Sequence, residues 1–177
     1  MKRFLLLFLA TVVTAWSASA QLSVSQLRTE HLTDPVGIGE RRPLLSWEVS
    51  DASRRGVTQS AYEIRVKSGG RTVWRTGKVA SAESAGVFYD GTPLTSDTRY
   101  TWQVRVWDDR GKASAWSRPA FWRTGLFDVG EWQARWIEPA VSDDLAAMFR
   151  RTFRVTKPVA EATVYVTAHG IYEASVN

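Results

Sequence analysis

The chain has 177 residues, of which 44% are hydrophobic, and it contains no cysteine. Disulfides, zinc sites built on thiolates and cysteine nucleophiles are therefore excluded. The formal net charge is +5 at pH 7, and the basic residues are scattered along the sequence instead of forming runs, which argues against a nucleic-acid-binding protein. Nine tryptophans are unusual for this length, and we expect most of them to fill a hydrophobic core.

Residues 1–20 are typical of a secretory signal peptide. Lys2 and Arg3 precede an apolar run over 4–13, and the segment ends in a small-residue Ala-Ser-Ala cleavage site. The run is too short for a comfortable membrane span, although an uncleaved anchor is the alternative. We expect export to the periplasm or the extracellular space, with no membrane association after cleavage. The mature chain would carry a charge of +3, because the leader removes two of the five positive charges.

Short strands separated by turns fill the next hundred residues, and no long helical pattern interrupts them. A loop with glycines and a proline is expected at 34–39, a tight hairpin turn at 68–70 and another turn at 109–111. Alternating apolar and polar residues predict seven strands, at 22–32, 45–49, 62–67, 72–74, 87–89, 100–108 and 116–123.

Tyr100 opens the most regular of these strands. The residues that follow it alternate between Trp102, Val104 and Val106 on one face and Thr101, Gln103, Arg105 and Trp107 on the other. A tyrosine at this place, six positions after Leu94, indicates the tyrosine corner of an immunoglobulin-like sandwich, in which the hydroxyl bonds to upstream backbone. Residues 21–127 are therefore predicted to form a fibronectin type III-like sandwich, although a longer single sandwich is the alternative.

A second pattern begins at Trp132, after a boundary expected at 127–131. Alternation predicts four further strands, at 132–137, 148–155, 164–168 and 171–177. Four strands in so few residues cannot close a sandwich. We therefore expect residues 128–177 to be the start of a second, incomplete β-sandwich domain in a truncated sequence.

Several segments, taken in order, resemble the N-terminal part of bacterial α-L-rhamnosidases of glycoside hydrolase family 78. They keep the family's spacing over nearly all of the mature chain, and the most specific is Arg99-Tyr100-Thr101-Trp102-Gln103-Val104-Arg105-Val106-Trp107-Asp108. The others are 34–38, 43–47, 59–64, 74–79, 114–117 and 132–137. The stretch 170–177 resembles the start of the family's second N-terminal module, a jelly-roll sandwich akin to carbohydrate-binding modules.

The resemblance implies an exported enzyme that hydrolyses terminal α-L-rhamnose from glycosides or glycans with inversion. In that family an (α/α)6 barrel further along carries the acid and base carboxylates. The catalytic residues are therefore expected beyond Asn177, none is assigned within this sequence, and the chain alone is expected to be inactive. This part would pack against the downstream domains. The alternatives are a non-enzymatic carbohydrate-binding or adhesion protein and a pseudogene remnant.

No residue pattern within the chain itself indicates catalysis or a metal. Glycoside hydrolysis normally needs two carboxyl groups flanking one bond, but the acidic pairs Asp108-Asp109 and Asp143-Asp144 lie in turn-like sequence and are expected to be solvated. His31 and His169 have no second ligand at a suitable spacing. We expect no cofactor and no metal.

Trp107 and Trp116 are the only candidate ligand-binding residues. Both are expected on the outer face of one sheet, together with Arg65, Lys67 and Arg105. Three interpretations remain open: an indole and guanidinium ladder, with about 0.5–1 kcal/mol per exposed cation–π pair, packing against a neighbouring domain, or stacking on a sugar.

Overall fold

The structure, a computed structural model, describes residues 22–140 and 146–176. The chain divides into two compact units, the first ending at Gln133 and the second beginning at Ala134. The predicted signal peptide, the Asp143-Asp144 pair and Asn177 lie outside the described residues. Within the described ranges, no helix has the length and apolar character needed to cross a membrane.

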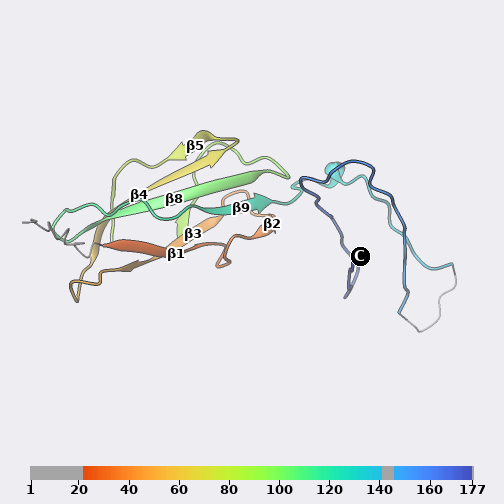
Figure 1. The fold of residues 1–177 in the computed structure, drawn as a ribbon, viewed down its shortest axis with the longest axis horizontal. Coiled ribbons are helices and arrows are strands. Elements are labelled where there is room, and N and C mark those ends of the chain that lie inside the picture. The colour runs from red at the N-terminus through yellow and green to blue at the C-terminus, as the bar shows by residue number, and fades with distance from the viewer. Residues whose placement is uncertain (1–21, 141–145, 177) are drawn as a thin grey trace, which may run out of the picture. The chain divides into compact units, whose positions relative to one another are not determined.

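Two β-sheets form the first unit (Figure 1). One sheet has the order β1-β3-β7, with β1 at Ser23–Thr29, β3 at Leu44–Ser50 and β7 at Val87–Phe88. The other has the order β2-β9-β8-β4-β5, with β2 at Val36–Ile38, β9 at Ala120–Thr124, β8 at Arg99–Asp108, β4 at Gln59–Ser68 and β5 at Arg71–Arg75. A further strand, β6 at Val79–Ala80, pairs with β4. The predicted immunoglobulin-like sandwich is confirmed.

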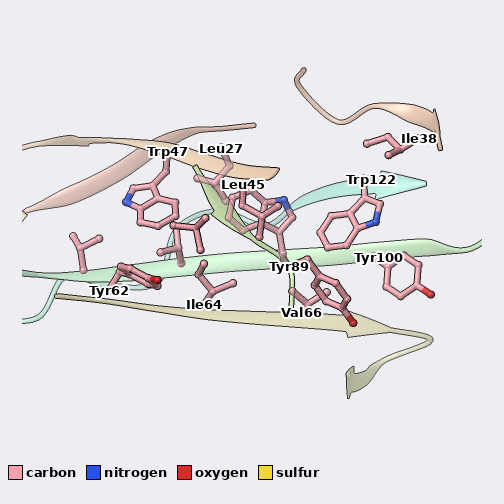
Figure 2. Packing of buried hydrophobic residues seen from close by; sticks show 14 of the residues in the cluster. Leu27, Ile38, Leu45, Trp47, Tyr62, Ile64, Val66, Tyr89, Tyr100 and Trp122 are labelled. Carbon is pink, nitrogen blue, oxygen red and sulfur yellow. The ribbon is translucent and has the colours of Figure 1, made fainter. Parts of the chain in front are cut away.

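The core lies between the two sheets and is rich in aromatic residues (Figure 2). Strand alternation turns Ile64 of β4 and its partner Val104 of β8 inward, and both side chains are fully buried. The Trp122 ring stacks on Tyr100 at 5.3 Å and meets Tyr89 edge-on at 5.9 Å. Each such aromatic pair contributes about 0.5–1.5 kcal/mol beyond the burial of its area.

Tyr100 forms the expected tyrosine corner. Its hydroxyl accepts a hydrogen bond of 3.0 Å from the backbone N–H of Thr95, and Leu94 beside it is buried. Thr124 of β9 closes the same loop, because its hydroxyl donates to the Thr95 carbonyl at 2.6 Å and accepts from the Thr98 N–H at 2.9 Å. The loop before β8 is thus tied to two strands.

Replacing Tyr100 with phenylalanine is expected to lower the free energy of unfolding by about 1–1.5 kcal/mol, because the Thr95 N–H loses its acceptor. Urea denaturation followed by circular dichroism measures this change. Tyr172→Phe is the control, since the Tyr172 side chain is exposed in the second unit. An unchanged midpoint for the Tyr100 variant would show that the corner does not contribute.

Two strands lie where none was predicted. Residues 36–38, predicted as part of a loop, pair in parallel with β9, where Gly125 N–H donates to the Ile38 carbonyl at 2.8 Å. The segment is too short for periodicity to identify, and Gly37 interrupts it with a φ of +84°. The two residues of β6 are shorter still. The predicted strand at 116–123 forms only from Ala120, since Pro119 has no N–H to donate to a ladder.

The prediction of four strands in 132–177 was wrong for the described residues. The structure assigns no strand to residues 132–140 or 146–176. A strand gains stability from hydrogen-bonded neighbours and a covered apolar face, and here Ile137, Phe153 and Val164 are exposed instead of packed in a layer. A short 3-10 helix, Val129–Glu131, precedes this region. The accessory sandwich domain at 128–177 stays a prediction.

Candidate functional site

The outer face of the larger sheet carries the residues singled out from the sequence. β4 and β8 pair so that Glu63 lies opposite Arg105, and Arg65 lies opposite Gln103. These positions alternate with the inward-facing residues, such as Ile64, so their side chains project away from the core. The predicted order, in which β8 lies between β4 and the last strand, is what brings them together.

Cations and indole rings alternate along this face. The Arg65 guanidinium lies 4.3 Å from the centre of the Trp116 ring. The Arg105 guanidinium lies 4.9 Å from Trp116 and 5.0 Å from Trp107. The Lys78 ammonium lies 4.7 Å from Trp107. We call these five residues the ladder. Its geometry is that of the cation–π interpretation, and Lys78 is the member that sequence reasoning missed.

The ladder includes the two indole rings, Trp107 and Trp116, that are the candidates for stacking on a sugar. Both indoles are half-buried, and cations lie over both rings. A sugar ring that stacked on either indole would compete with the cations for the ring. The assignment of the two tryptophans to ligand binding stays a prediction.

Glu63 is a buried carboxylate on this face, with an exposed fraction of 2%. Its Oε1 accepts from the Arg75 Nε at 2.6 Å, and its Oε2 accepts from the Arg105 Nε at 2.8 Å. Burial raises the pKa of Glu63, but the hydrogen bonds and charges of Arg75 and Arg105 outweigh this effect and hold the pKa below its ordinary value. The ion pair between Glu63 and Arg105 could have been found from the sequence, because both residues occupy outward positions on predicted strands that lie side by side.

Two serines place Trp116 on the ladder. The backbone N–H of Ser114 donates to the Val106 carbonyl at 2.8 Å, and its Oγ accepts from the Val106 N–H at 3.0 Å. Ser117 does the same at Val104, with distances of 2.8 and 3.1 Å. The two serine hydroxyls thus accept the β8 N–H groups that a neighbouring strand's carbonyls would otherwise accept. Residues 113–117 therefore lie bonded along the edge of β8 without forming a regular strand.

The Asp108-Asp109 pair organises a turn. The Asp108 carboxylate accepts from the backbone N–H groups of Lys112 at 2.7 Å and Arg110 at 3.0 Å, and Arg54 forms ion pairs with both aspartates. The hydrogen bond from Lys112 is the largest cause that lowers the pKa of Asp108. Asp108 is 7% exposed, so the expectation of a solvated carboxylate was wrong for it, whereas Asp109 is exposed.

The histidines lie apart from any acidic cluster among the described residues, where no group of three or more His, Cys, Asp or Glu could hold a metal ion. His31 is exposed just after β1. The His169 ring stacks on Trp136 at 4.1 Å in the second unit.

A second polar cluster fixes the chain as it leaves the sandwich. The Glu131 Oε2 accepts from the Ser96 hydroxyl at 2.6 Å, the Phe127 N–H at 2.9 Å and the Asp128 N–H at 3.0 Å. Arg41 pairs with Asp128 at 3.0 Å and lies 4.6 Å from the centre of the Phe127 ring. We call these five residues the exit clamp. The hydrogen bond from Ser96, more than any other contact, lowers the pKa of Glu131.

Replacing Glu131 with alanine is expected to speed amide hydrogen exchange severalfold at Asp128, whose N–H loses its acceptor. The effect at Phe127 should be smaller, because its N–H keeps the Ser96 hydroxyl as an acceptor at 3.0 Å. The Val104 amide, which bonds to Ser117 inside the sandwich, should exchange as before. Glu138→Ala is the matched control, since Glu138 is an exposed residue of the second unit. Equal exchange in both variants would show that Glu131 does not hold the clamp.

The fold and these surfaces define the class of protein: it is an immunoglobulin-like domain. Its polar clusters hold strands and turns of the same domain together. The family model described as "Rha78A-like, N-terminal immunoglobulin domain" matches residues 24–128. The chain belongs to this family of N-terminal domains.

Curated relatives and solved structures agree with the family. An α-L-rhamnosidase of Streptomyces avermitilis is 37% identical over 185 residues, covering 88% of this chain and 18% of the relative. One of Alteromonas sp. is 34% identical and covers 84% of this chain and 18% of the relative. The S. avermitilis α-L-rhamnosidase structure, complexed with L-rhamnose, has a TM-score of 0.64 and 43% identity over 68% of this chain and 12% of that one. The Dictyoglumus thermophilum structure scores 0.62, with 33% identity over 66% of this chain and 14% of that one.

The chain therefore spans about one fifth of the length of these curated relatives. Apart from 132–137 and 170–177, the segments that carried the resemblance lie within the matched residues 24–128, and the recognition of the rhamnosidase family is confirmed for this part of the protein.

Proposed function

We propose that this chain is the N-terminal, non-catalytic part of an exported α-L-rhamnosidase, which hydrolyses terminal α-L-rhamnose from glycosides or glycans. The match to the family's N-terminal immunoglobulin domain carries the proposal. Glu63, Asp108 and Glu131 each accept hydrogen bonds within the domain, so these carboxylates serve the fold and not a scissile bond. The acid and base would come from a further domain, beyond Asn177.

The proposed role of this part is to position the domains that come after it. The exit clamp supports this role, because Glu131 and Arg41 tie the residues after β9 to loops of the sandwich. Residues 127–131 are thus bonded to the sandwich, unlike the residues of a flexible linker. The sandwich would pack against the downstream domains of the enzyme, and the substrate would be rhamnose-containing glycans bound by the whole protein.

Residues 1–20 support the proposal of export, through their charged start, apolar run and small-residue end. A fusion of these residues to a reporter that is active only outside the cytoplasm tests it. Export of the reporter is expected, and its loss is expected when two charged residues interrupt the apolar run.

The second candidate function is a non-enzymatic carbohydrate-binding or adhesion protein, which the basic and aromatic outer face of the sandwich favours. Reading the gene beyond codon 177 separates the two. Several hundred further residues with helical periodicity and acidic clusters are expected for the rhamnosidase. A stop codon, or a further series of short strands, would instead support the adhesion protein or a gene remnant.

A further inference from the structure

The outer face of the larger sheet is strongly basic. It carries Arg65, Lys67, Arg75, Lys78, Arg99 and Arg105, from β4, β5, β8 and the segment before β6, and we call this set the basic face. The carboxylates among or beside these cations have partners of their own: Glu63 pairs with Arg75 and Arg105, and Asp97 with Arg123. The Asp34 carboxylate accepts from the Phe121 backbone N–H at 2.8 Å. The face therefore presents a positive potential to solvent.

Its cations are held in place before any partner arrives. Arg65 donates Nε and Nη2 to the Gln103 Oε1, at 3.2 and 2.7 Å, while stacking on Trp116. Arg99 lies 3.6 Å from the centre of the Phe121 ring. A guanidinium has five N–H donors, so Arg65 keeps donors beyond the two that Gln103 uses. Groups held in this way lose little freedom on binding.

The cations also remain accessible. The Arg75 and Arg105 side chains have exposed fractions of 61% and 31%, and Lys78 and Arg99 are exposed. Carboxylates and sulfates accept paired hydrogen bonds from guanidinium groups. A partner with repeated anionic groups could therefore contact several members of the basic face at once.

The chemistry favours a saccharide over a protein partner. Lysine is depleted at protein interfaces relative to the rest of the surface, whereas the basic face includes Lys67 on β4 and Lys78 before β6. The half-buried rings of Trp107 and Trp116 lie close to the cations, so an extended sugar chain would meet aromatic and charged groups on the same face.

We propose that the basic face binds an anionic polysaccharide through its carboxylate or sulfate groups. This binding is a property of the sandwich itself and is independent of rhamnoside hydrolysis, so it can hold or fail whatever the gene encodes beyond codon 177.

Affinity electrophoresis of the purified chain tests the proposal, with four polymers in the gel: polygalacturonate, dextran sulfate, neutral dextran and poly-L-glutamate. Retardation by polygalacturonate or dextran sulfate is expected, and the stronger of the two identifies carboxylate or sulfate as the preferred group. The retardation should weaken as salt rises above about 0.15 M. Neutral dextran should have no effect.

Two charge-matched double variants assign the binding to the face. Lys67→Gln with Lys78→Gln is expected to weaken binding about fivefold, from the loss of two charged contacts. Arg28→Gln with Arg55→Gln, at exposed positions on β1 and in the loop before β4, should leave the affinity unchanged. Thermal unfolding of each variant shows that it is folded.

Three outcomes would overturn the proposal. They are no retardation by either anionic polysaccharide, equal losses in the two double variants, or retardation by poly-L-glutamate as strong as by polygalacturonate. The last would mean that the face binds acidic protein chains and not saccharides.

Discussion

Trp122→Ala is expected to lower the free energy of unfolding by about 3–5 kcal/mol, the usual range for removing a large aromatic side chain from a core. Trp122 is fully buried in β9 and contacts Tyr100 of the tyrosine corner and Tyr89 after β7. Figure 2 shows its ring between the two sheets. Its removal leaves a cavity in the core beside Tyr100 and Tyr89.

The measurement is urea denaturation of the whole chain followed by circular dichroism. Trp136→Ala is the matched control, because the Trp136 side chain is 65% exposed in the second unit, and it should change stability by less than about 0.5 kcal/mol. Similar losses for the two variants would contradict the packing described for the sandwich.

The second large effect is expected from Glu63→Gln, which should lower the free energy of unfolding by about 2 kcal/mol. A glutamine keeps the shape of the side chain but directs an NH2 group at one of the two arginines that the carboxylate bonds. Hydrogen bonds to charged groups contribute about 1.5–3 kcal/mol, and the exposure of Arg75 places the value in the lower half of that range.

The same residue predicts a dependence on pH. Because the pKa of Glu63 is lowered in the folded chain, its contribution is complete above the unfolded value of about 4.3 and is lost as the pH falls through the folded value. The difference in stability between wild type and Glu63→Gln should therefore shrink in acid. Glu48→Gln, at an exposed position on β3, should show no such trend. A difference that stays constant down to low pH would contradict the buried ion pair.

The sequence predicted the sandwich because its strands have one buried face. In β8 the alternation from Tyr100 to Trp107 assigned each side chain to the core or the surface, and the hydroxyl of Tyr100 bonds upstream as expected. The outward placement of Arg65, Arg105 and Trp107 followed from the same period of two. Periodicity therefore found the face that carries the ladder.

Other features depend on contacts that have no local signal. Ser114 and Ser117 replace a strand through their hydroxyls, and Lys78 reaches Trp107 from a neighbouring connection. β2 has three residues and depends on a partner far along the chain. In the second unit the alternation was real, but alternation marks a strand only where another strand pairs with it.

Hydrolysis of p-nitrophenyl α-L-rhamnopyranoside by the purified chain tests the central claim, that this family member's sandwich is a non-catalytic part of a rhamnosidase. A rate equal to that of the buffer blank is expected at every pH, because the acid and base of the proposed enzyme would come from a further domain and Glu63, Asp108 and Glu131 are bonded within the sandwich. Saturable release of p-nitrophenol that scales with the concentration of the chain would contradict it.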